Sequence, residues 1–419
     1  MSSNTLFNLV WIVAPKATGG LLLVLTNIVI LQQFQPSDFG YFTLCLTTIL
    51  LVDALVGSAF DLGVVRLASL QRDRDLAQSL GIEAAAFWLK ILLVVCLGIV
   101  LLTSSNFLET RVLPTENAQA LLWFSYAAIV GTLIFRSCMV NVQVDQRFVI
   151  YGALEWMHLL LRYGLAIACV FQGERSIEAV IGGFALGTGV SCLVGLAVIV
   201  ATHGWCGSFT KAHVKELMSC VKWYLPGNAA GALRDRVDIF MLAAWTDMNI
   251  VGHYSAARVA TSAVDLISMY LSVILAPRIM PRVEAGNFLS MFKQVQLVLT
   301  LATVLLALLT ISLTGLVIEA WLPAEYSNTK TVFVILIFGS LSGLLVNPLV
   351  VPYLAFIKPS SLMVLNGAVL PFVMLGYTLS IPAFGVVGAA WVTAAGRIFP
   401  ALLALALAWS WAHNHRRAQ

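Results

Sequence analysis

The sequence predicts an all-helical membrane protein with about twelve spans, arranged as two similar lobes of six helices. Composition gives the class: 60% of the 419 residues are hydrophobic, 11% are charged and the mean hydropathy is +0.92, whereas soluble domains carry about 25% charged residues. The apolar runs are roughly 20 residues long, which lets a helix cross about 30 Å of hydrocarbon. The alternation typical of a membrane barrel is absent, so helices are expected.

The two halves of the chain repeat each other without a gap at an offset of 212 residues (252 − 40). Four matched positions illustrate the repeat: Gly40 with Gly252, Phe42 with Tyr254, Asp53 with Asp265, and Arg66 with Arg278. The apolar stretches follow the same shift. Since six spans are an even number, the two lobes, expected at residues 1–205 and 206–419, should be parallel repeats with the site at the seam between them.

The expected spans lie near residues 9–33, 39–60, 79–103, 118–140, 149–171, 178–201, 221–245, 250–276, 291–314, 329–352, 360–380 and 385–411. One set of the connections and the carboxyl-terminal tail together hold about eleven Lys and Arg residues, and the other set holds about two. The positive-inside rule therefore places the basic set and both termini in the cytoplasm. The longest outward loop, residues 104–117, is too short to hold a soluble domain.

Ionisable residues inside the predicted spans are the candidates for function, because a charge at membrane depth costs at least a few kcal/mol unless it faces a cavity or a partner. Twelve residues meet this description: Lys16, Asp53, Lys90, Arg136, Glu155, Arg162, Arg234, Arg236, Asp238, Arg258, Asp265 and Arg397. Basic residues outnumber acidic ones among them. A cavity lined in this way would favour an anion, and the planar fork of arginine suits phosphate.

The predicted seventh span carries the densest charge. Arg234 and Asp238 are four residues apart and would share one helical face, whereas Arg236 would point about 200° away from Arg234. Arg234 and Asp238 could line a cavity or form an ion pair within one helix. Arg236 is open between the cavity and a snorkelling or interhelical role. Pro226 precedes the cluster and is expected to kink or break the helix entry.

The predicted fifth span places Glu155, His158 and Arg162 on one helical face. Arg162 could contact an anion in a cavity, with Glu155 as its neutralising or proton-carrying neighbour, or the set could form a structural pair between helices. His158 by itself is typical of a hydrogen-bonded packing residue.

The eighth span holds Arg258 and Asp265 seven residues apart, again on one face. Asp53 is the repeat partner of Asp265, so this acidic pair could carry a coupling proton or cation, or could bridge neighbouring helices in both lobes. Arg397 is central in the last span.

Three other cations are read from their position in the chain. Lys16 follows Pro15 in the first span, whereas Lys90 and Arg136 lie nearer the cytoplasmic side and are expected to snorkel.

No enzyme motif stands out. The triplet 73–75 (DRD) lies in a short basic loop and is expected to be a solvated turn, and the glycines of 182–189 follow no strand. The seven cysteines form no CxxC pair, so neither a disulfide framework nor a metal cluster is expected. We therefore expect no catalytic site, cofactor or metal. The net charge of +4 is spread over helix ends, which does not favour nucleic acid.

Four segments together resemble the polysaccharide-export branch of the MOP flippase superfamily, the Wzx-type transporters. They are residues 35–42 (QPSDFGYF), 61–66 (DLGVVR), 236–238 with 251–257 (RVD and VGHYSAA), and 381–390 (IPAFGVVGAA). Each segment alone is weak, but their order and spacing are fairly specific to that family. The likeness covers nearly the whole chain.

The resemblance implies a MATE/MOP-like fold around a central cavity, in the inner membrane of a bacterium. It implies a flippase that moves oligosaccharide repeat units, linked to a polyprenyl diphosphate, outward by alternating access for polysaccharide synthesis, such as that of O-antigen, lipopolysaccharide or exopolysaccharide. A proton or sodium ion, or the membrane potential, would drive the cycle, and the assembly machinery would be a partner. Only Asp238 and its neighbours carry over from the family motif. Lys16, Arg162 and Arg397 rest on their position in the spans.

Other classes are weighed against this interpretation. A MATE-like exporter of small organic cations would share the fold but should have an acidic cavity. A flippase for the peptidoglycan precursor typically has extra spans, for which this length leaves no room. A polymerase or ligase would need a long outward loop, and a non-transport component of polysaccharide assembly would not need central arginines.

Overall fold

The computed structural model describes residues 3–72, 74–115, 117–172, 176–203, 208–284, 288–327, 329–357 and 359–418, and within these ranges every regular element is a helix. The chain forms two compact units. The first holds Met1–Gln33 and Tyr41–Ala232, and the second holds Phe34–Gly40 and Leu233–Gln419. The all-helical architecture predicted from composition is confirmed. The lobe boundary expected at 205/206 lies outside the described residues.

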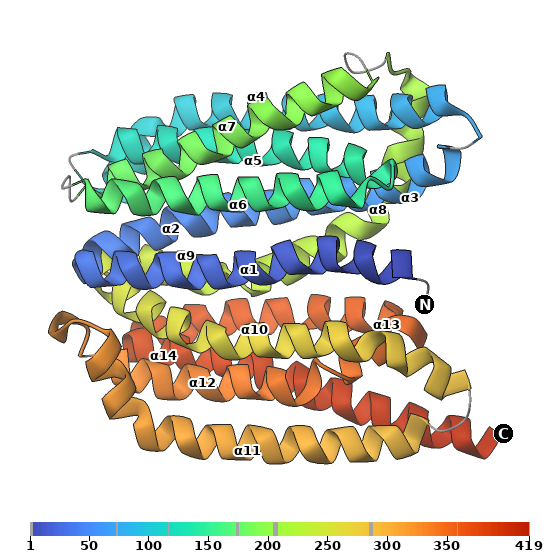
Figure 1. The fold of residues 1–419 in the computed structure, drawn as a ribbon. Helices are drawn as coiled ribbons and strands as arrows, with labels where there is room; N and C mark the ends of the chain where they lie inside the picture. Colours follow the sequence, from blue (N-terminus) through green and yellow to red (C-terminus); the bar gives the residue numbers. More distant parts are fainter. Residues whose placement is uncertain are drawn as a thin grey trace. The chain divides into compact units, whose positions relative to one another are not determined.

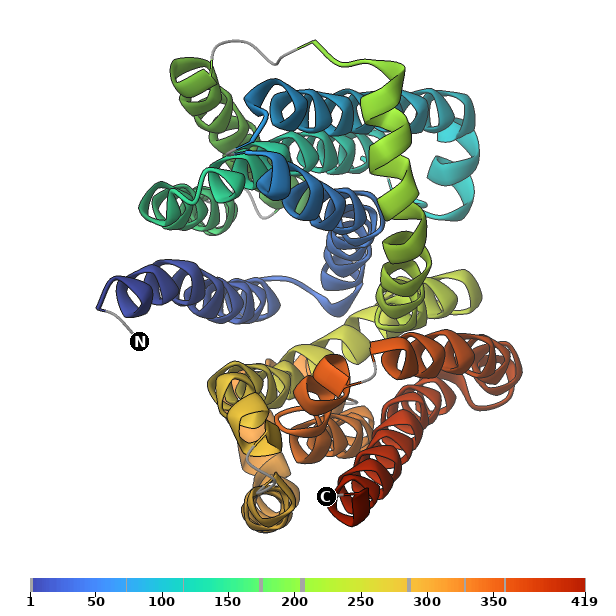
Figure 2. The same ribbon diagram turned by 90° about the vertical axis from the view of Figure 1, so that its right-hand side faces the viewer.

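The first unit holds α1 (Ser3–Gln33), α2 (Pro36–Val52), the π-helix η1 (Asp53–Gly57), α3 (Ser58–Gln71), α4 (Leu76–Arg111), α5 (Ala118–Val144), α6 (Phe148–Phe171), α7 (Ile177–His203) and α8 (Lys211–Arg234). The start of α2, up to Gly40, and the end of α8, from Leu233, belong to the second unit. In the first unit the long helices α4, α5, α6 and α7 run side by side, and α8 runs across their direction (Figures 1 and 2). Helix α7 packs on both α5 and α6, and α1 packs on α6. The α3, α4 and α5 helices share an apolar core with Leu217 and Val221 of α8.

The second unit holds α9 (Val237–Trp245), α10 (Met248–Glu284), α11 (Phe288–Trp321), the 3-10 turn η2 (Ala324–Tyr326), α12 (Thr329–Val346), α13 (Val350–Ile357) and α14 (Pro359–Ala418). Helix α12 packs on α10, α11 and α14, and α9 packs on α14. One apolar core, which includes Ile279, Phe292, Leu349 and Ala404, joins α10, α11 and α14 to the region between α12 and α13. Helix α14 thus contacts α9, α10, α11, α12 and α13, which places it beside most elements of the site described below.

The internal repeat reappears as a contact between two helix starts within the second unit. A Cβ atom built on Gly40 would strike the carbonyl oxygen of Met248, and one built on Gly252 would strike that of Pro36. Met248 follows Pro36 at the repeat offset (248 − 36 = 212), so each glycine packs on the partner position of the other half. The start of α2 and the start of α10 thus approach each other through matched glycines, which leave room for backbone.

The predicted spans correspond to the helices with several corrections. Eight helices of the described residues are long and apolar enough to cross a membrane by length and composition. Helix α4 continues to Arg111, so most of the loop expected at 104–117 is helical. The break expected between the last two spans is present at Gly385, whose φ of 57° is open to glycine without strain.

Two interruptions were not anticipated by the apolar pattern. The second span contains the π-helical turn η1, which begins at Asp53; such turns occur frequently at functional sites. The seventh span is divided at Asp235 and Arg236, between α8 and α9, whereas Pro226 lies inside α8. The helix therefore continues past Pro226, and the complete break lies about ten residues later.

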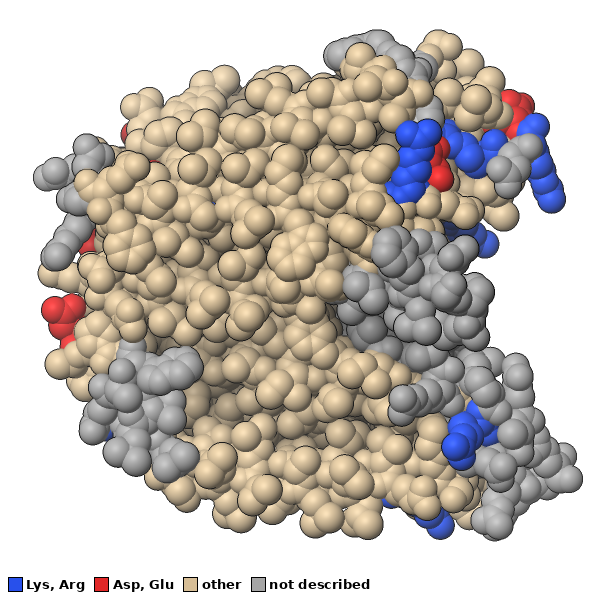
Figure 3. Space-filling view, viewed as in Figure 1, with Lys and Arg blue, Asp and Glu red and all other residues tan. Residues whose placement is uncertain are grey.

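The charged side chains follow the pattern of a multi-pass membrane protein. On the face drawn in Figure 3, the described residues across the middle show no Lys, Arg, Asp or Glu, and the Lys and Arg atoms gather towards the end at the right. A broad uncharged belt with charges at its ends is what a bilayer requires of the helices that face it.

The matched glycines give a first prediction. Gly252→Ala should destabilise the protein by about 1–3 kcal/mol, because the new methyl group overlaps backbone that cannot rotate away. Gly189→Ala is the matched control, since nothing lies within 4 Å of its Cβ position in α7, and it should keep or slightly raise stability. Thermal unfolding of both variants in detergent measures the difference; equal melting temperatures would contradict the close approach.

Candidate functional site

The break between α8 and α9 is held in place by α10. The backbone amide of Arg236 donates to the carbonyl of Leu233 at 3.1 Å, which closes the turn. Arg258 of α10 donates from Nη2 to the carbonyl oxygen of Asp235. Non-helical backbone at membrane depth is tolerated only where protein or a water-filled cavity satisfies its polar groups. Arg258 supplies one such partner, and a cavity lies directly beside it.

Asp238 holds Arg258 in place beside the break. Its side chain is 2% exposed and accepts from Arg258 Nη1 at 2.6 Å and from the Tyr254 hydroxyl at 2.6 Å. The Tyr254 hydroxyl also lies 2.7 Å from Thr393 Oγ1, which in turn lies 2.8 Å from the Tyr377 hydroxyl. This buried network joins α9, α10 and α14, so it fixes the walls of the site relative to one another.

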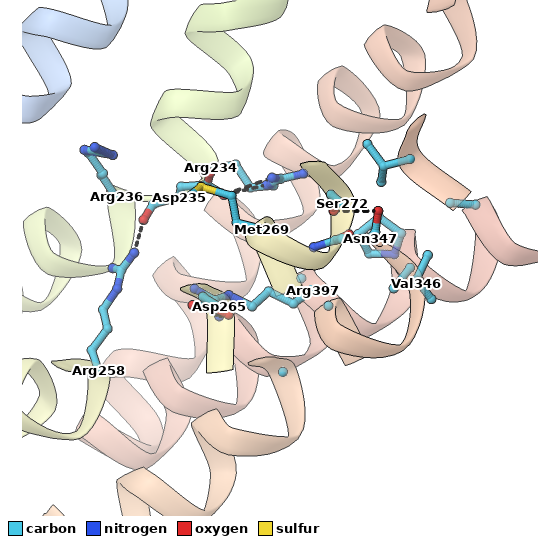
Figure 4. A pocket seen from close by; sticks show the side chains of 17 residues that line it. Arg234, Asp235, Arg236, Arg258, Asp265, Met269, Ser272, Val346, Asn347 and Arg397 are labelled. Carbon is cyan, nitrogen blue, oxygen red and sulfur yellow. Dashed lines mark hydrogen bonds and ion pairs between the residues drawn. The ribbon is translucent and has the colours of Figure 1, made fainter. Parts of the chain in front are cut away.

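The cavity itself has a volume of about 570 Å³ and lies within the second unit. Four arginines line it: Arg234 and Arg236 from the α8–α9 break, Arg258 from α10, and Arg397 from α14. Figure 4 shows these side chains around the space, with Ser272 and Asn347 on the wall formed by α10 and the end of α12. Pro400 and small residues such as Ala401 and Ala404 form the apolar wall contributed by α14.

The described hydrogen bonds of Arg397 use only one nitrogen of its guanidinium group. It donates from Nη1 to Asp265 at 3.0 and 3.2 Å and to Ser340 Oγ at 2.8 Å. Within the described part of the chain, these hydrogen bonds all leave from that one nitrogen. The side chain of Asp265 is 40% exposed, so this ion pair stands at the cavity wall rather than in the core.

The four arginines do not have the same surroundings. Arg234 binds Asp235 through Nε at 3.0 Å and Nη2 at 2.9 Å, and Asp235 is exposed. Arg258, in contrast, is fixed by the buried Asp238. Four arginines and three aspartates, counting Asp238, leave one positive charge in excess among the described residues of this site. The intrahelical pair of Arg234 with Asp238 considered from the sequence is wrong, because the helix breaks between them.

A second cluster of charges lies in the first unit, where two carboxylates pair with two cations. Asp61 accepts from Lys90 Nζ at 2.5 Å and from Arg136 Nε at 2.8 Å, and Asp53 accepts from Arg136 Nη1 at 3.2 Å. Lys90 is 2% exposed and also donates to Ser137 at 3.1 Å. The expectation that Lys90 and Arg136 snorkel is therefore wrong: both turn inward to buried carboxylates, since a partner inside the bundle removes the need to reach the membrane surface.

Arg162 is buried in the same unit, among aromatic rings. Its Nη2 donates to the Tyr163 hydroxyl at 2.6 Å and its Nη1 lies 3.3 Å from His158 Nε2. The guanidinium stands 4.5 Å from the Tyr163 ring centre and 5.0 Å from that of Phe184. Glu155 lies within electrostatic reach of Arg136, whereas the Lys16 side chain lies outside the described residues. The described lining of the arginine-lined cavity includes neither Arg162 nor Glu155.

The fold is shared with known transporters. The lipid II flippase MurJ, in an inward closed conformation, is 12% identical, with a TM-score of 0.79 over 94% of this chain and 86% of that chain. An inward-facing multidrug resistance MATE family transporter of the MOP superfamily is 11% identical, with a TM-score of 0.65 over 98% and 99%. A mutant of the Vibrio cholerae MATE transporter VcmN is 15% identical, with a TM-score of 0.64 over 100% and 99%. No curated protein sequence matches the chain.

The family is decided by the sequence itself. Residues 6–283 match the profile described as "Polysaccharide biosynthesis protein", which is more than half of the chain. The chain belongs to this family. It is therefore a multi-pass membrane member of the polysaccharide biosynthesis protein family with the fold of MOP-superfamily transporters, and the resemblance read from the four segments is confirmed.

Several residues that form these charged clusters were not predicted from the sequence. Asp235 lines the cavity and Asp61 ties together the first-unit cluster, although neither was proposed as a site residue. Tyr254 is the repeat partner of Phe42 and lies in the segment 251–257, but it was not among the candidate site residues. The repeat has phenylalanine in one half and tyrosine in the other at this position, so Tyr254 adds one hydroxyl to a buried site. This difference could have indicated a buried polar contact, because the hydroxyl donates to Asp238.

The Asp238 network gives a second prediction. Arg258→Ala should cost about 3–5 kcal/mol of stability, because it leaves a buried carboxylate without its cation. Arg234→Ala should cost about 1 kcal/mol or less, since Asp235 is exposed. Combining Arg258→Ala with Asp238→Asn should recover part of the loss. Thermal unfolding in detergent compares the three variants, and an Arg258→Ala protein as stable as Arg234→Ala would rule out the anchoring role of Asp238.

Proposed function

We propose that this protein is a flippase for oligosaccharides linked to a polyprenyl diphosphate, and that its arginine-lined cavity binds the diphosphate. The proposal places it in the inner membrane of a bacterium, with both termini in the cytoplasm, where it passes repeat units outward by alternating access to the polysaccharide assembly machinery. Membership of the polysaccharide biosynthesis protein family supports the class of cargo.

The observation that carries the proposal is the excess of positive charge in a pocket of ligand size. Four arginines line a volume of about 570 Å³, which falls in the range of roughly 300–1,000 Å³ typical of ligand sites. A diphosphate carries several acceptor oxygens, and arginine binds such groups through two parallel hydrogen bonds. A cavity built for organic cations would need an excess of carboxylates instead.

The four arginines of the cavity would have different roles in binding the diphosphate. Arg258 is committed to Asp238 and to the broken backbone, so it is a positioning residue. Arg234 and Arg397 pair with half-exposed carboxylates at the cavity wall, and Arg236 lies between them in sequence at the break. In this mechanism the diphosphate displaces Asp265 from Arg397. Asp265 then becomes free to take up a coupling proton or sodium ion.

The membrane potential would favour the outward step. Moving one elementary charge across the membrane is worth about 2.3 kcal/mol per 100 mV. An anionic cargo that leaves a negative interior moves down this gradient, whether or not an ion is exchanged for it. Transport of this kind needs no nucleotide.

The central test measures flipping of a fluorescent polyprenyl-diphosphate sugar in proteoliposomes. Arg397→Gln and Arg234→Gln should each slow flipping by about 10- to 100-fold, because a hydrogen bond to a charged group is worth about 1.5–3 kcal/mol. Arg66→Gln is the matched control: it removes the same charge from an exposed position of α3, outside the cavity, and should flip at the rate of the unaltered protein.

Two outcomes would overturn the proposal. Flipping that is unchanged in both cavity variants would remove the diphosphate from this site. An unaltered protein that flips no diphosphate lipid but exports organic cations would belong functionally with the MATE-like exporters.

The exchange at Arg397 gives a further prediction. Asp265→Asn should bind inorganic pyrophosphate several times more tightly, because the carboxylate that competes for Arg397 is gone, and should flip the lipid more slowly, because release then lacks its competitor. Isothermal titration and the flipping assay measure the two effects. Asp247→Asn, at an exposed position between α9 and α10, should change neither; weaker pyrophosphate binding in Asp265→Asn would refute the exchange.

A further inference from the structure

A second hollow lies in the second unit, between α11 and α14, with a volume of about 610 Å³. On α11 its lining residues Lys293, Gln296, Leu297 and Thr300 follow the spacing i, i+3, i+4, i+7, which places them on one helical face. On α14 the residues from Leu402 to Trp409 that line it follow the same spacing. Two straight stripes thus face each other along a groove that is apolar for most of its length.

One end of the groove holds a lysine and a tryptophan that lie close together. Lys293 is exposed, and its ammonium stands 5.8 Å from the ring centre of Trp409. Trp409 is 45% exposed and lies against Phe292, with ring centres 6.0 Å apart. Lysine and tryptophan together are typical of the membrane–water interface. Among the described residues no carboxylate forms an ion pair with Lys293, and no acidic residue lines the groove.

The groove is separate from the arginine-lined cavity, although α14 lines both. Arg397, Ala401 and Ala404 line the cavity, whereas Leu402 and Leu405 line the groove. At 100° per residue these two sets occupy different sides of the helix. A molecule in the groove is therefore not the molecule bound by the cavity arginines.

Helix α11 itself is sparsely covered. Only 6% of the most apolar window of Leu289–Ser312 is buried, the lowest share among the eight candidate spans of the described residues. Large side chains such as Leu297, Leu301 and Leu305 are more than half exposed. The described residues leave this face of α11 uncovered, and in a bilayer lipid would cover it.

We propose that this groove, which runs from Lys293 and Trp409 along α11 and α14, binds one anionic glycerophospholipid as a resident ligand. One acyl chain lies between the two helical stripes, and the phosphate and its anionic headgroup contact Lys293. Among the described residues that line the groove, Lys293 is the one charged side chain, and it selects an anionic lipid over a zwitterionic one, because a choline headgroup would bring its own cation to the same place.

The test compares retained lipids by native mass spectrometry of the full-length protein in detergent. Phosphatidylglycerol and phosphatidylcholine with identical acyl chains are added at equal concentration. The protein should retain one phosphatidylglycerol in preference to phosphatidylcholine. Lys293→Gln should lower this preference about fivefold, since one basic residue near a membrane surface is worth about that factor in binding anionic lipid.

Two further variants keep the result specific. Lys222→Gln is the matched control, because Lys222 stands 5.4 Å over the ring of Trp223 without lining the groove, and it should bind lipid like the unaltered protein. Ala406→Phe fills the groove without changing charge and should lower retention of both lipids. Equal phosphatidylglycerol retention in Lys293→Gln, Ala406→Phe and the unaltered protein would overturn the proposal. So would preferential retention of a polyprenyl phosphate, which would assign the groove to the tail of a transported lipid.

Discussion

A carboxylate buried in an apolar bundle must be paired, and the second unit is organised around one such residue. Asp238 is almost fully enclosed and receives hydrogen bonds from Arg258 and Tyr254. Because Arg258 also binds the carbonyl of Asp235, the same cation neutralises the carboxylate and satisfies the broken backbone. The break in turn directs Arg234 and Arg236 to the cavity. Removing Arg258 alone would leave both the Asp238 carboxylate and the open backbone without compensation, so fold and site depend on the same contact.

The two acids that the repeat relates, Asp53 and Asp265, have different surroundings. In the first unit Asp53, Asp61, Lys90 and Arg136 form a balanced cluster of two acids and two bases, in which Lys90 has almost no exposure. In the second unit the corresponding acid, Asp265, is 40% exposed and meets its arginine at a cavity wall. The repeat positions therefore differ in their use of charge: Asp53 belongs to a cluster that joins helices, and Asp265 lies with its arginine at the wall of the cavity.

Composition, run length and the repeat were enough to predict the helical class and most of the helices, because the cost of exposing polar backbone to lipid leaves few alternatives. The set of arginines was also visible, since four of the proposed residues line one cavity. The break at Asp235 was not predictable from local propensity. Pro226 is the stronger signal in the sequence, yet tertiary contacts from Arg258 decide where the helix ends. The inward turn of Lys90 depends on Asp61, which is 29 residues away (90 − 61) on another helix. No helical spacing relates the two residues, so the sequence does not reveal their contact.

The degree to which each arginine is paired decides what it can do for a transported anion. A guanidinium with no partner would be expensive to keep in a cavity, and one that is fully paired by a buried acid, as Arg258 is, has little left to offer a ligand. Arg397 stands between these limits: its three hydrogen bonds all use Nη1 and its acid is half exposed. An ion pair of this kind can be exchanged for a ligand and restored when the ligand leaves. A transporter needs both steps, because binding that is too tight would end the cycle as surely as binding that is too weak.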